Sequence, residues 1–410
     1  MISVLDPQPN TVINTSRPAV QVHPLLRGGS FLWGGFEATN CLRSDGVRLD
    51  LLRSTEHDRR CDEDYLLLKE LFGVNTVRES LSWAHIEERR GTRDFARFES
   101  MMRSAEKRNI NQIWALTHFG FPDWVGDIVS DVDEFSKRFA EYAVHATSII
   151  RKYQGGDVWI TPLNEGSFLS WIAGDEATWM PFLRGRGLAL KIALCRACVA
   201  AIRAMRQEYP QVRFMHTDPL MYRVPRDPCD QKAAELAEGF HDARFEWLDM
   251  LMGFKFPELG GCPECVDVVA LNYYSHNQQE VVADATRPSG YHFVRIPLED
   301  ETRVPLSTLL TEVYERYGKD LVIGEFGHYI ETHPFYRDQR VLFCDSVFDG
   351  MFDAAMKGVP IRGACHYPVI DYQDWFDGFM HYSGMLDERR RPYAELRHSL
   401  VENTQRFISA

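Results

Sequence analysis

The chain has 410 residues, of which 45% are hydrophobic and 26% charged, the composition of an ordinary globular protein. Its 46 Lys and Arg residues against 59 Asp and Glu residues leave a formal net charge of −13, which argues against binding to nucleic acid or to an anionic membrane surface. The sequence shows no basic segment leading into an apolar core and no apolar stretch of about 18 residues, so we expect a cytoplasmic protein without a signal peptide or membrane span.

Short apolar runs alternate along the chain with segments of helical periodicity, which is typical of βα units. The predicted strands are residues 30–35, 76–81, 113–117, 158–163, 213–218, 266–272, 321–325 and 361–367. The predicted helices are residues 62–72, 95–108, 132–153, 188–208, 231–252, 307–317, 339–357 and 392–407.

Eight repeats of this kind predict a single α/β domain, a (β/α)8 TIM barrel of residues 28–410 after an N-terminal extension of residues 1–27. Spare length follows four of the predicted strands, in residues 42–61, 166–187, 220–230 and 273–306. Because the loops after the strands build the catalytic face of a barrel, we expect enlarged loops around a site there.

Polar side chains stand at the ends of most predicted strands, where barrels carry their catalytic groups. The second strand carries Arg78, the fourth ends in Asn164-Glu165 and the seventh ends in Glu325. Two carboxylates on different strands suit glycoside hydrolysis with retention of configuration, in which one attacks the anomeric carbon and the other, about 5–5.5 Å away, protonates the leaving oxygen.

Several motifs resemble, in order, those of glycoside hydrolase family 1, the β-glucosidase and β-galactosidase family. They are Phe31-Leu32-Trp33-Gly34, Asn75-Thr76-Val77-Arg78 with Ser82-Trp83, Leu116-Thr117-His118 with Pro122-Asp123-Trp124, Asn164-Glu165, Leu271-Asn272-Tyr273-Tyr274, Gly324-Glu325-Phe326-Gly327, Asp371 with Asp374-Trp375, and Arg391-Pro392. The Gly-Glu-Phe-Gly form also occurs in other retaining hydrolases of the same clan, clan A. The resemblance implies a retaining exo-β-glycosidase that hydrolyses a small neutral β-glycoside through a covalent glycosyl-enzyme, without a cofactor.

The resemblance implies that Glu165 is the acid/base and Glu325 the nucleophile. A nucleophilic carboxylate must stay ionised, and Arg78 beside it with the hydroxyl of Tyr274 would lower its pKa by opposite charge and hydrogen bonding. The acid must be protonated at neutral pH, which limited solvation and the negative charge of its partner would achieve. Asn164 matches the family position that binds the sugar 2-OH.

A second group of residues matches family positions that hold the rest of the sugar. We expect hydroxyl contacts from His118, Asp374 and Trp375, a supporting role for Asn272, and stacking on the sugar face from the aromatic candidates Trp33, Trp124 and Tyr367.

The sequence departs from the family at several of these positions. The Gln that normally follows the first strand is absent, and our hypothesis is that Glu37 or Asn40 takes over part of its role. Asp374 replaces a Glu and Tyr367-Pro368 replaces a Trp-Ser pair, so the sequence leaves the glycone and the aglycone open. Glu79 stands where the family carries an aromatic residue, with no evident reason in the sequence.

Nine cysteines, an odd number, suit a reducing compartment with free thiols. Four of them form the pairs Cys195-x-x-Cys198 and Cys262-x-x-Cys265, which together resemble a zinc site. We expect no metal, because the first pair lies within a predicted helix and reads as core packing. The second pair lies on a turn, and its role stays open.

Two other functions remain compatible with the sequence. One is a carbohydrate-binding barrel that has lost turnover, and the other is a clan A glycosidase that acts by transglycosylation or on a polymeric glycan. The oligomeric state stays open as well.

Overall fold

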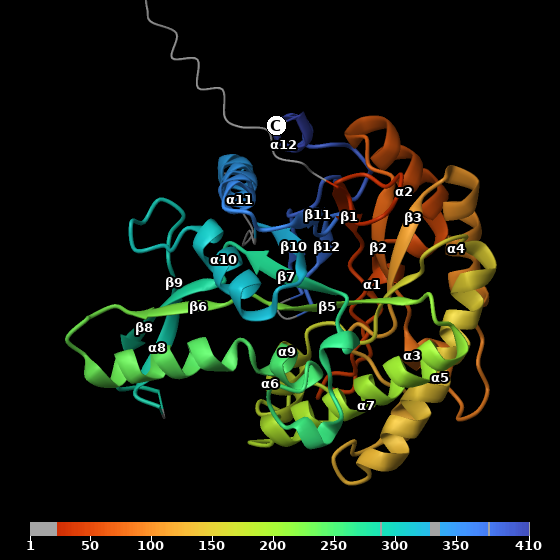
Figure 1. The fold of residues 1–410 in the computed structure, drawn as a ribbon, viewed down its shortest axis with the longest axis horizontal. Helices are drawn as coiled ribbons and strands as arrows, with labels where there is room; N and C mark the ends of the chain where they lie inside the picture. Colours follow the sequence, from red (N-terminus) through yellow and green to blue (C-terminus); the bar gives the residue numbers. More distant parts are fainter. Residues whose placement is uncertain (1–22, 288, 329–336, 376–377, 410) are drawn as a thin grey trace, which may run out of the picture.

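The computed structural model describes residues 23–287, 289–328, 337–375 and 378–409. Eight parallel strands close into a barrel in the order β1, β11, β10, β7, β5, β4, β3, β2 (Figure 1). The strands are β1 Leu32–Gly35, β2 Thr76–Ser80, β3 Asn111–Ala115, β4 Trp159–Thr161, β5 Arg213–Pro219, β7 Val268–Tyr274, β10 Asp320–Gly327 and β11 Ile361–His366. Each lies on one of the predicted strands, which confirms the predicted (β/α)8 barrel.

Helices surround the barrel (Figure 1). The long ones are α2 His57–Phe72, α4 Ala96–Arg108, α5 Val132–Tyr153, α7 Gly187–Glu208, α8 Gln231–Ala243, α10 Leu306–Tyr317, α11 Arg337–Met356 and α12 Ala394–Ser409. Shorter elements are α1 Leu51–Ser54, α3 Trp83–Ile86, α6 Gly166–Gly174, α9 Glu246–Leu251, the 3-10 turns Asp123–Val125, Pro257–Leu259 and Pro263–Cys265, and the strand pair β12 Tyr372–Gln373 and β13 Met380–His381. No helix in the described ranges is long and apolar enough to cross a membrane.

The prediction of one helix over residues 231–252 was wrong. The segment forms two helices, α8 and α9, separated at Arg244 and Phe245. Only Ala233 and Ala237 of α8 are buried, whereas all but the first residue of α9 are, so the two pieces pack in different surroundings. The predicted N-terminal extension lies mostly outside the described residues, although Leu25 and Leu26 pack against the bottom of the barrel.

Trp33 lies in the barrel floor, so its predicted role in sugar stacking is not supported. The side chain is fully buried and packs in a cluster inside the barrel with Ile113, Trp159 and Val322. Its indole nitrogen donates to the carbonyl oxygen of Ser30 at 2.9 Å. A Trp on the first strand therefore fills the core layer below the catalytic face.

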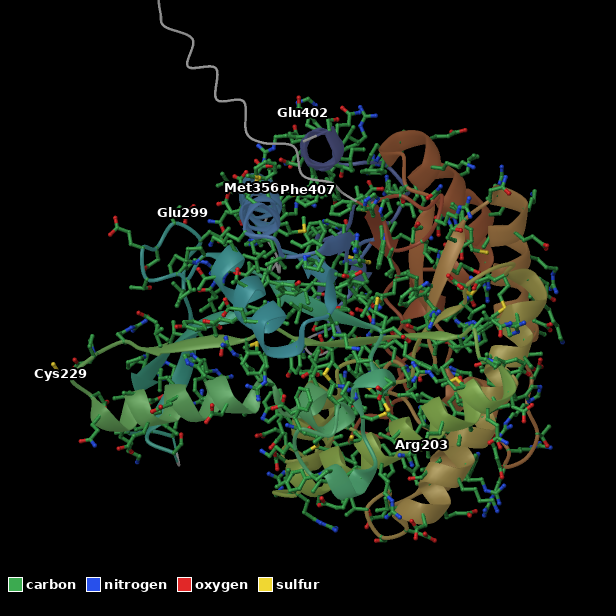
Figure 2. All side chains as sticks on the ribbon, in the orientation of Figure 1. Arg203, Cys229, Glu299, Met356, Glu402 and Phe407 are labelled. Atoms are coloured by element: carbon green, nitrogen blue, oxygen red, sulfur yellow. The ribbon has the colours of Figure 1, made fainter. Side chains whose placement is uncertain are left out.

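An arm extends from the barrel and is built from the segments that follow β5 and β7 (Figure 1). It consists of a three-stranded sheet, β6 Tyr222–Pro225, β8 Gln278–Ala283 and β9 Tyr291–Arg295, covered by α8. Figure 2 labels Cys229 at its outer end, well away from the barrel. These strands were not predicted, and two of the four expected loop enlargements, residues 220–230 and 273–306, supply all three of them.

Glu79 belongs to a buried charge network between β2 and α2. The Nε2 of His57 lies 3.0 Å from a Glu79 oxygen, and its Nδ1 lies 2.8 Å from Asp64. Asp64 in turn accepts from Nε of Arg390 at 2.9 Å. Burial alone would lower the pKa of His57, but the Glu79 and Asp64 carboxylates outweigh it and raise that pKa to about 9. Two cations and two carboxylates thus balance, which gives Glu79 the structural reason that the sequence lacked.

Replacing Arg390 with Met is expected to destabilise the protein by about 3–5 kcal/mol, because it leaves the two buried carboxylates of the network with His57 as their single cation. Urea unfolding at pH 7 measures the change. Arg391→Met is the matched control, since the side chain of Arg391 is 67% exposed. A loss as small as that of the control would contradict the role of the network.

His57 should contribute to the free energy of unfolding in a pH-dependent way. Because folding raises its pKa from 6.5 to about 9, its contribution should be complete below pH 6.5 and disappear as the pH rises through about 9.

Candidate active site

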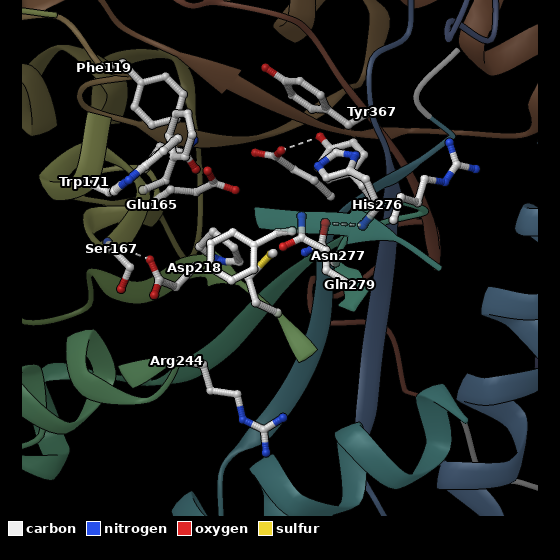
Figure 3. A pocket seen from close by; sticks show the side chains of 18 of the residues that line it. Phe119, Glu165, Ser167, Trp171, Asp218, Arg244, His276, Asn277, Gln279 and Tyr367 are labelled. Carbon is white, nitrogen blue, oxygen red and sulfur yellow. Dashed lines mark hydrogen bonds between the residues drawn. The ribbon is translucent and has the colours of Figure 1, made fainter. Parts of the chain in front are cut away.

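A cavity of about 1600 Å³ opens at the carboxyl ends of the barrel strands and continues along the arm (Figure 3). Nine of the residues predicted for the site line it: Glu37, His118, Asn164, Glu165, Tyr274, Glu325, Tyr367, Asp374 and Trp375. Arg78 and Asn272 lie just behind this surface and hydrogen-bond to the two glutamates. The structure therefore brings together most of the residues that the sequence singled out.

Glu325 near the end of β10 is held by two donors. The guanidinium of Arg78 on β2 donates to one carboxylate oxygen, and the hydroxyl of Tyr274 at the end of β7 donates to the other at 2.6 Å. Burial, reinforced by the Glu325 charge, raises the pKa of Tyr274 well above its ordinary value, so this hydroxyl keeps its proton. Both carboxylate oxygens of Glu325 therefore accept a hydrogen bond.

Glu165 caps the start of α6 in an unusual backbone conformation. Its φ is +45°, in the left-handed region that costs a non-glycine residue on the order of 1–3 kcal/mol. The neighbouring Gly166 has no room for a side chain, because a Cβ there would lie 2.4 Å from the ring of Trp247 on α9. The amide of Glu165 donates to the carbonyl oxygen of Thr217 on β5 at 3.1 Å. These contacts fix the direction in which Glu165 leaves the barrel rim.

The surroundings of Glu165 differ from those of Glu325. Burial raises the pKa of Glu165 well above its ordinary value, and the charge of Glu325 raises it further. One hydrogen bond, from the side-chain amide of Asn272 at 2.7 Å, opposes this effect in part. The two carboxyl groups therefore differ in their contacts: Glu325 accepts from a guanidinium and a phenol, whereas Glu165 accepts from one amide.

Asn164 and His118 connect the glutamates to the barrel wall. The side-chain oxygen of Asn164 accepts from Arg78 at 2.6 Å and from Thr217 at 2.8 Å, and its amide nitrogen lies 3.1 Å from Nε2 of His118. The other ring nitrogen of His118 lies 3.2 Å from the Ser80 hydroxyl. Burial and the Arg78 charge lower the pKa of His118 well below its ordinary value, so the ring is neutral.

Four of the residues expected to contact the sugar form one wall of the cavity. Glu37 accepts from the backbone and hydroxyl of Thr39, and burial raises its pKa to about 7. Asp374 is buried, with an oxygen 3.6 Å from Nδ1 of His381. The hydroxyl of Tyr367 donates to the carbonyl oxygen of Phe36 at 3.2 Å. Trp375 packs edge-on against Trp179, with ring centroids 4.9 Å apart.

Two predicted site residues lie elsewhere. Asn40 does not line the cavity, and its amide nitrogen instead donates to the backbone carbonyl oxygens of Ala38 and His118. Trp124 also lies outside the cavity, where its indole nitrogen donates to the carbonyl oxygen of Glu87 at 2.7 Å. We therefore correct both predictions: Asn40 bonds to the backbone of His118, and Trp124, on the loop after β3, packs against Trp83 on α3.

Asp218 at the end of β5 is a site residue that we did not predict. It lines the cavity, one of its oxygens accepts from the backbone of Ser167 at 3.0 Å, and the other has no hydrogen-bond partner (Figure 3). Burial raises the pKa of Asp218 to about 7. Its charge is one of the causes that raise the pKa of Glu165. Asp218 is thus a further buried carboxyl group in the cavity, and its charge acts on Glu165.

Replacing Asp218 with Asn is expected to move the basic limb of the pH profile of kcat/KM to lower pH. Once Asp218 is ionised, above about pH 7, its charge favours the protonated Glu165, and Asn removes that charge while it keeps the bond from Ser167. The measurement is kcat/KM against pH for both proteins. Asp175→Asn, at the far end of α6, is the control and should leave the limb in place. A shift to higher pH would contradict the prediction.

The four paired cysteines do not form a metal cluster in the part of the chain that the structure describes. The sulfurs of Cys262 and Cys265 lie 3.4 Å apart, and Cys195 and Cys198 are buried on α7. All nine cysteines are free thiols.

No protein-family model and no curated protein matches the chain. Solved structures do match it. A family 1 β-glucosidase from Thermotoga maritima has a TM-score of 0.74 at 18% identity, over 94% of this chain and 99% of that one. The chain has the fold of family 1 β-glucosidases. The Thermotoga maritima β-glucosidase in complex with glucoimidazole matches with a TM-score of 0.74 at 19% identity, over 92% of this chain and 98% of that one. The complex of the Thermotoga maritima β-glucosidase with galacto-hydroximolactam matches with a TM-score of 0.74 at 19% identity, over 94% of this chain and 99% of that one.

Proposed function

We propose that the protein is a retaining exo-β-glycosidase that hydrolyses a small β-glycoside with a neutral glycone. The observation that carries this proposal is the pair of strand-end glutamates in one cavity with opposite electrostatic surroundings. Arg78 and Tyr274 donate hydrogen bonds to the carboxylate of Glu325, whereas burial and the Glu325 charge favour the protonated Glu165. Retaining hydrolysis needs one ionised and one protonated carboxyl group. The fold shared with family 1 β-glucosidases supports the proposal.

The proposed mechanism has two steps. The Glu325 carboxylate attacks the anomeric carbon, the glycosidic bond breaks, and the proton of Glu165 passes to the leaving oxygen. Glu325 then no longer carries a charge, which removes one cause of the raised Glu165 pKa. The ionised Glu165 takes a proton from water, whose oxygen attacks the anomeric carbon, and Glu325 leaves as a carboxylate. No cofactor enters either step.

The remaining residues of the wall suit recognition of the sugar. The side chain of Asn164 is held by Arg78 at its oxygen and lies beside His118 with its amide nitrogen, and this amide would bind the sugar 2-OH. Glu37 and Asp374, buried carboxyl groups at the same end, would bind other hydroxyls, with Tyr367 and Trp375 against the ring faces. We also propose the cytoplasm as the compartment, on the odd number of cysteines.

A panel of nitrophenyl α- and β-glycosides, covering gluco, galacto, fuco, xylo, manno and furanosyl sugars, tests the function. We expect hydrolysis of at least one β-glycoside, with the β-anomer as the first product in proton NMR. Release of the α-anomer would contradict retention. Binding of a sugar by calorimetry without hydrolysis of any glycoside would favour a carbohydrate-binding barrel instead. Transfer of the sugar to an added alcohol would instead indicate a transglycosylase, and cleavage of a polymeric glycan would indicate an enzyme that acts on polymers.

A further inference from the structure

The charges that line the cavity are unevenly distributed. Its inner part carries carboxyl groups on the barrel strands and the loops that follow them, namely Glu37, Glu165, Asp218, Glu325 and Asp374. Its outer part, along and beside the arm, carries the arginines Arg223, Arg244 and Arg295. The remaining charged residues of the lining are mixed in sign, namely Lys191, its partner Glu246, Asp175 and Glu299. If the glycone lies against the inner wall, as proposed above, the leaving group extends toward these arginines.

Arg223 and Arg295 stand in one row across the arm sheet. Arg223 on β6 is in register with Gln279 on β8, and Gln279 is in register with Arg295 on β9. Residues in register on neighbouring strands project from the same face of a sheet. All three line the cavity, and Nε of Arg223 donates to the side-chain oxygen of Gln279 at 3.0 Å. The sheet thus presents a polar, cationic row to the outer cavity.

The guanidinium of Arg223 is fixed by aromatic rings. Its central carbon lies 3.6 Å from the ring centroid of Phe240 on α8 and 3.9 Å from that of Phe293 on β9. The two rings stand at 88° to each other, so the guanidinium occupies the corner between them. Stacking of this kind holds the group in place without using its terminal nitrogens.

Arg223 has no carboxylate partner within the described chain, unlike its neighbours in the cavity. Lys191 pairs with Glu246 and Arg244 pairs with Glu312. The hydrogen bond that the Arg223 side chain donates to Gln279 comes from Nε. Burial lowers the pKa of Arg223 to about 10, which still leaves the group charged at neutral pH. A half-buried cation without a counter-ion, facing a cavity, is the counterpart of an anionic ligand.

We propose that the outer cavity binds the leaving group of the substrate and that this leaving group carries a carboxylate, held by Arg223 with Arg295 beside it. The inference rests on the proposed glycosidase function. The sequence led us to expect a neutral β-glycoside, whereas the substrate inferred here has a neutral glycone and an anionic leaving group. Nε of Arg223 already donates to Gln279. The two terminal nitrogens of the guanidinium can therefore donate in parallel to the two oxygens of a planar carboxylate. The inner carboxyl groups would repel the same anion, so the charge distribution also fixes the direction in which the substrate binds.

The test compares two β-glycosides of the sugar found with the panel, one with a 4-carboxyphenyl and one with a 4-carbamoylphenyl leaving group. For the wild-type protein we expect a ratio of kcat/KM, acid to amide, of roughly ten or more, and a smaller ratio in high salt. Arg223→Met should lower the ratio to about one. Arg223→Lys should keep only part of it, because the ammonium lacks the planar fork. The ratio is independent of the amount of folded protein.

Arg226→Met is the matched control, because Arg226 follows β6, pairs with Glu280 and does not line the cavity. It should leave the ratio unchanged. A wild-type ratio near one, together with hydrolysis that depends on Glu325, would overturn this inference and leave the proposed function standing. A 4-phosphonophenyl glycoside preferred over the carboxylate would overturn the carboxylate assignment. If no glycoside is cleaved, NMR titration compares the binding of 4-hydroxybenzoate and 4-hydroxybenzamide. The inference is overturned if the wild-type protein binds the two compounds equally, or if Arg223→Met leaves the binding of 4-hydroxybenzoate unchanged.

Discussion

Glu325→Ala is expected to lower kcat for the best β-glycoside by at least about three orders of magnitude, because the variant has no group to attack the anomeric carbon. The surrounding contacts should survive the substitution, since Arg78 keeps its bond to Asn164 and the backbone N–H of Tyr274 still donates to the side-chain oxygen of Asn277. Steady-state rates measure the loss. Glu315→Ala, an exposed position on α10, controls for the substitution itself.

Azide distinguishes this variant from a merely damaged protein. A small anion can occupy the space of the lost carboxylate and attack the sugar from the same side. The glycosyl azide should then have the α configuration, inverted relative to the substrate. A β-glycosyl azide from Glu325→Ala, or turnover close to wild type, would remove Glu325 from the role of nucleophile.

Glu165→Ala is expected to slow substrates with poor leaving groups by about 10²–10⁴-fold, because these need a proton on the departing oxygen. With activated aryl glycosides, the rate of forming the glycosyl-enzyme should fall less. Release of the phenol should show a burst, because hydrolysis of the glycosyl-enzyme lacks its base. The basic limb of the pH profile should also disappear. In the wild type, we expect activity to fall as Glu165 loses its proton, at a pH above the usual carboxyl range because burial and the Glu325 charge raise its pKa.

Azide again provides the decisive product. Here it attacks the glycosyl-enzyme in place of water, so the azide should have the β configuration, retained from the substrate. Glu176→Ala, an exposed position just after α6, is the control. The same anomer of the azide from both glutamate variants would contradict the assignment of separate roles.

The barrel and its two glutamates were accessible to sequence reasoning for a physical reason. Parallel barrel strands are buried on both faces, so runs such as residues 266–272 stand out as apolar, and the residue that ends each run lies at the rim. Asp218 also ends such a run, at residues 213–218, and the same reasoning applied to the fifth strand would have found it. Trp33 misled because an aromatic residue on a strand can fill the barrel interior as well as face a ligand.

The arm could not be predicted because its pairing is not local. Arg223 and Gln279 are in register although 56 residues separate them in the chain. Each of the three strands is short and only half-buried, without the continuous apolar pattern of the barrel strands. Likewise, the network of His57, Glu79 and Arg390 joins three distant segments, and no spacing in the sequence connects them.

The contact of Trp247 with Gly166 has a consequence for engineering. Trp247 lies on α9, which follows α8 of the arm after two residues, so one stretch of chain both covers the outer cavity and fixes the backbone at Glu165. A graft that exchanges the arm for that of another barrel, to change which leaving groups are accepted, should therefore end before Glu246 and retain α9. A chimera that also replaces α9 would alter the backbone at Glu165, the proposed acid/base, along with the outer cavity.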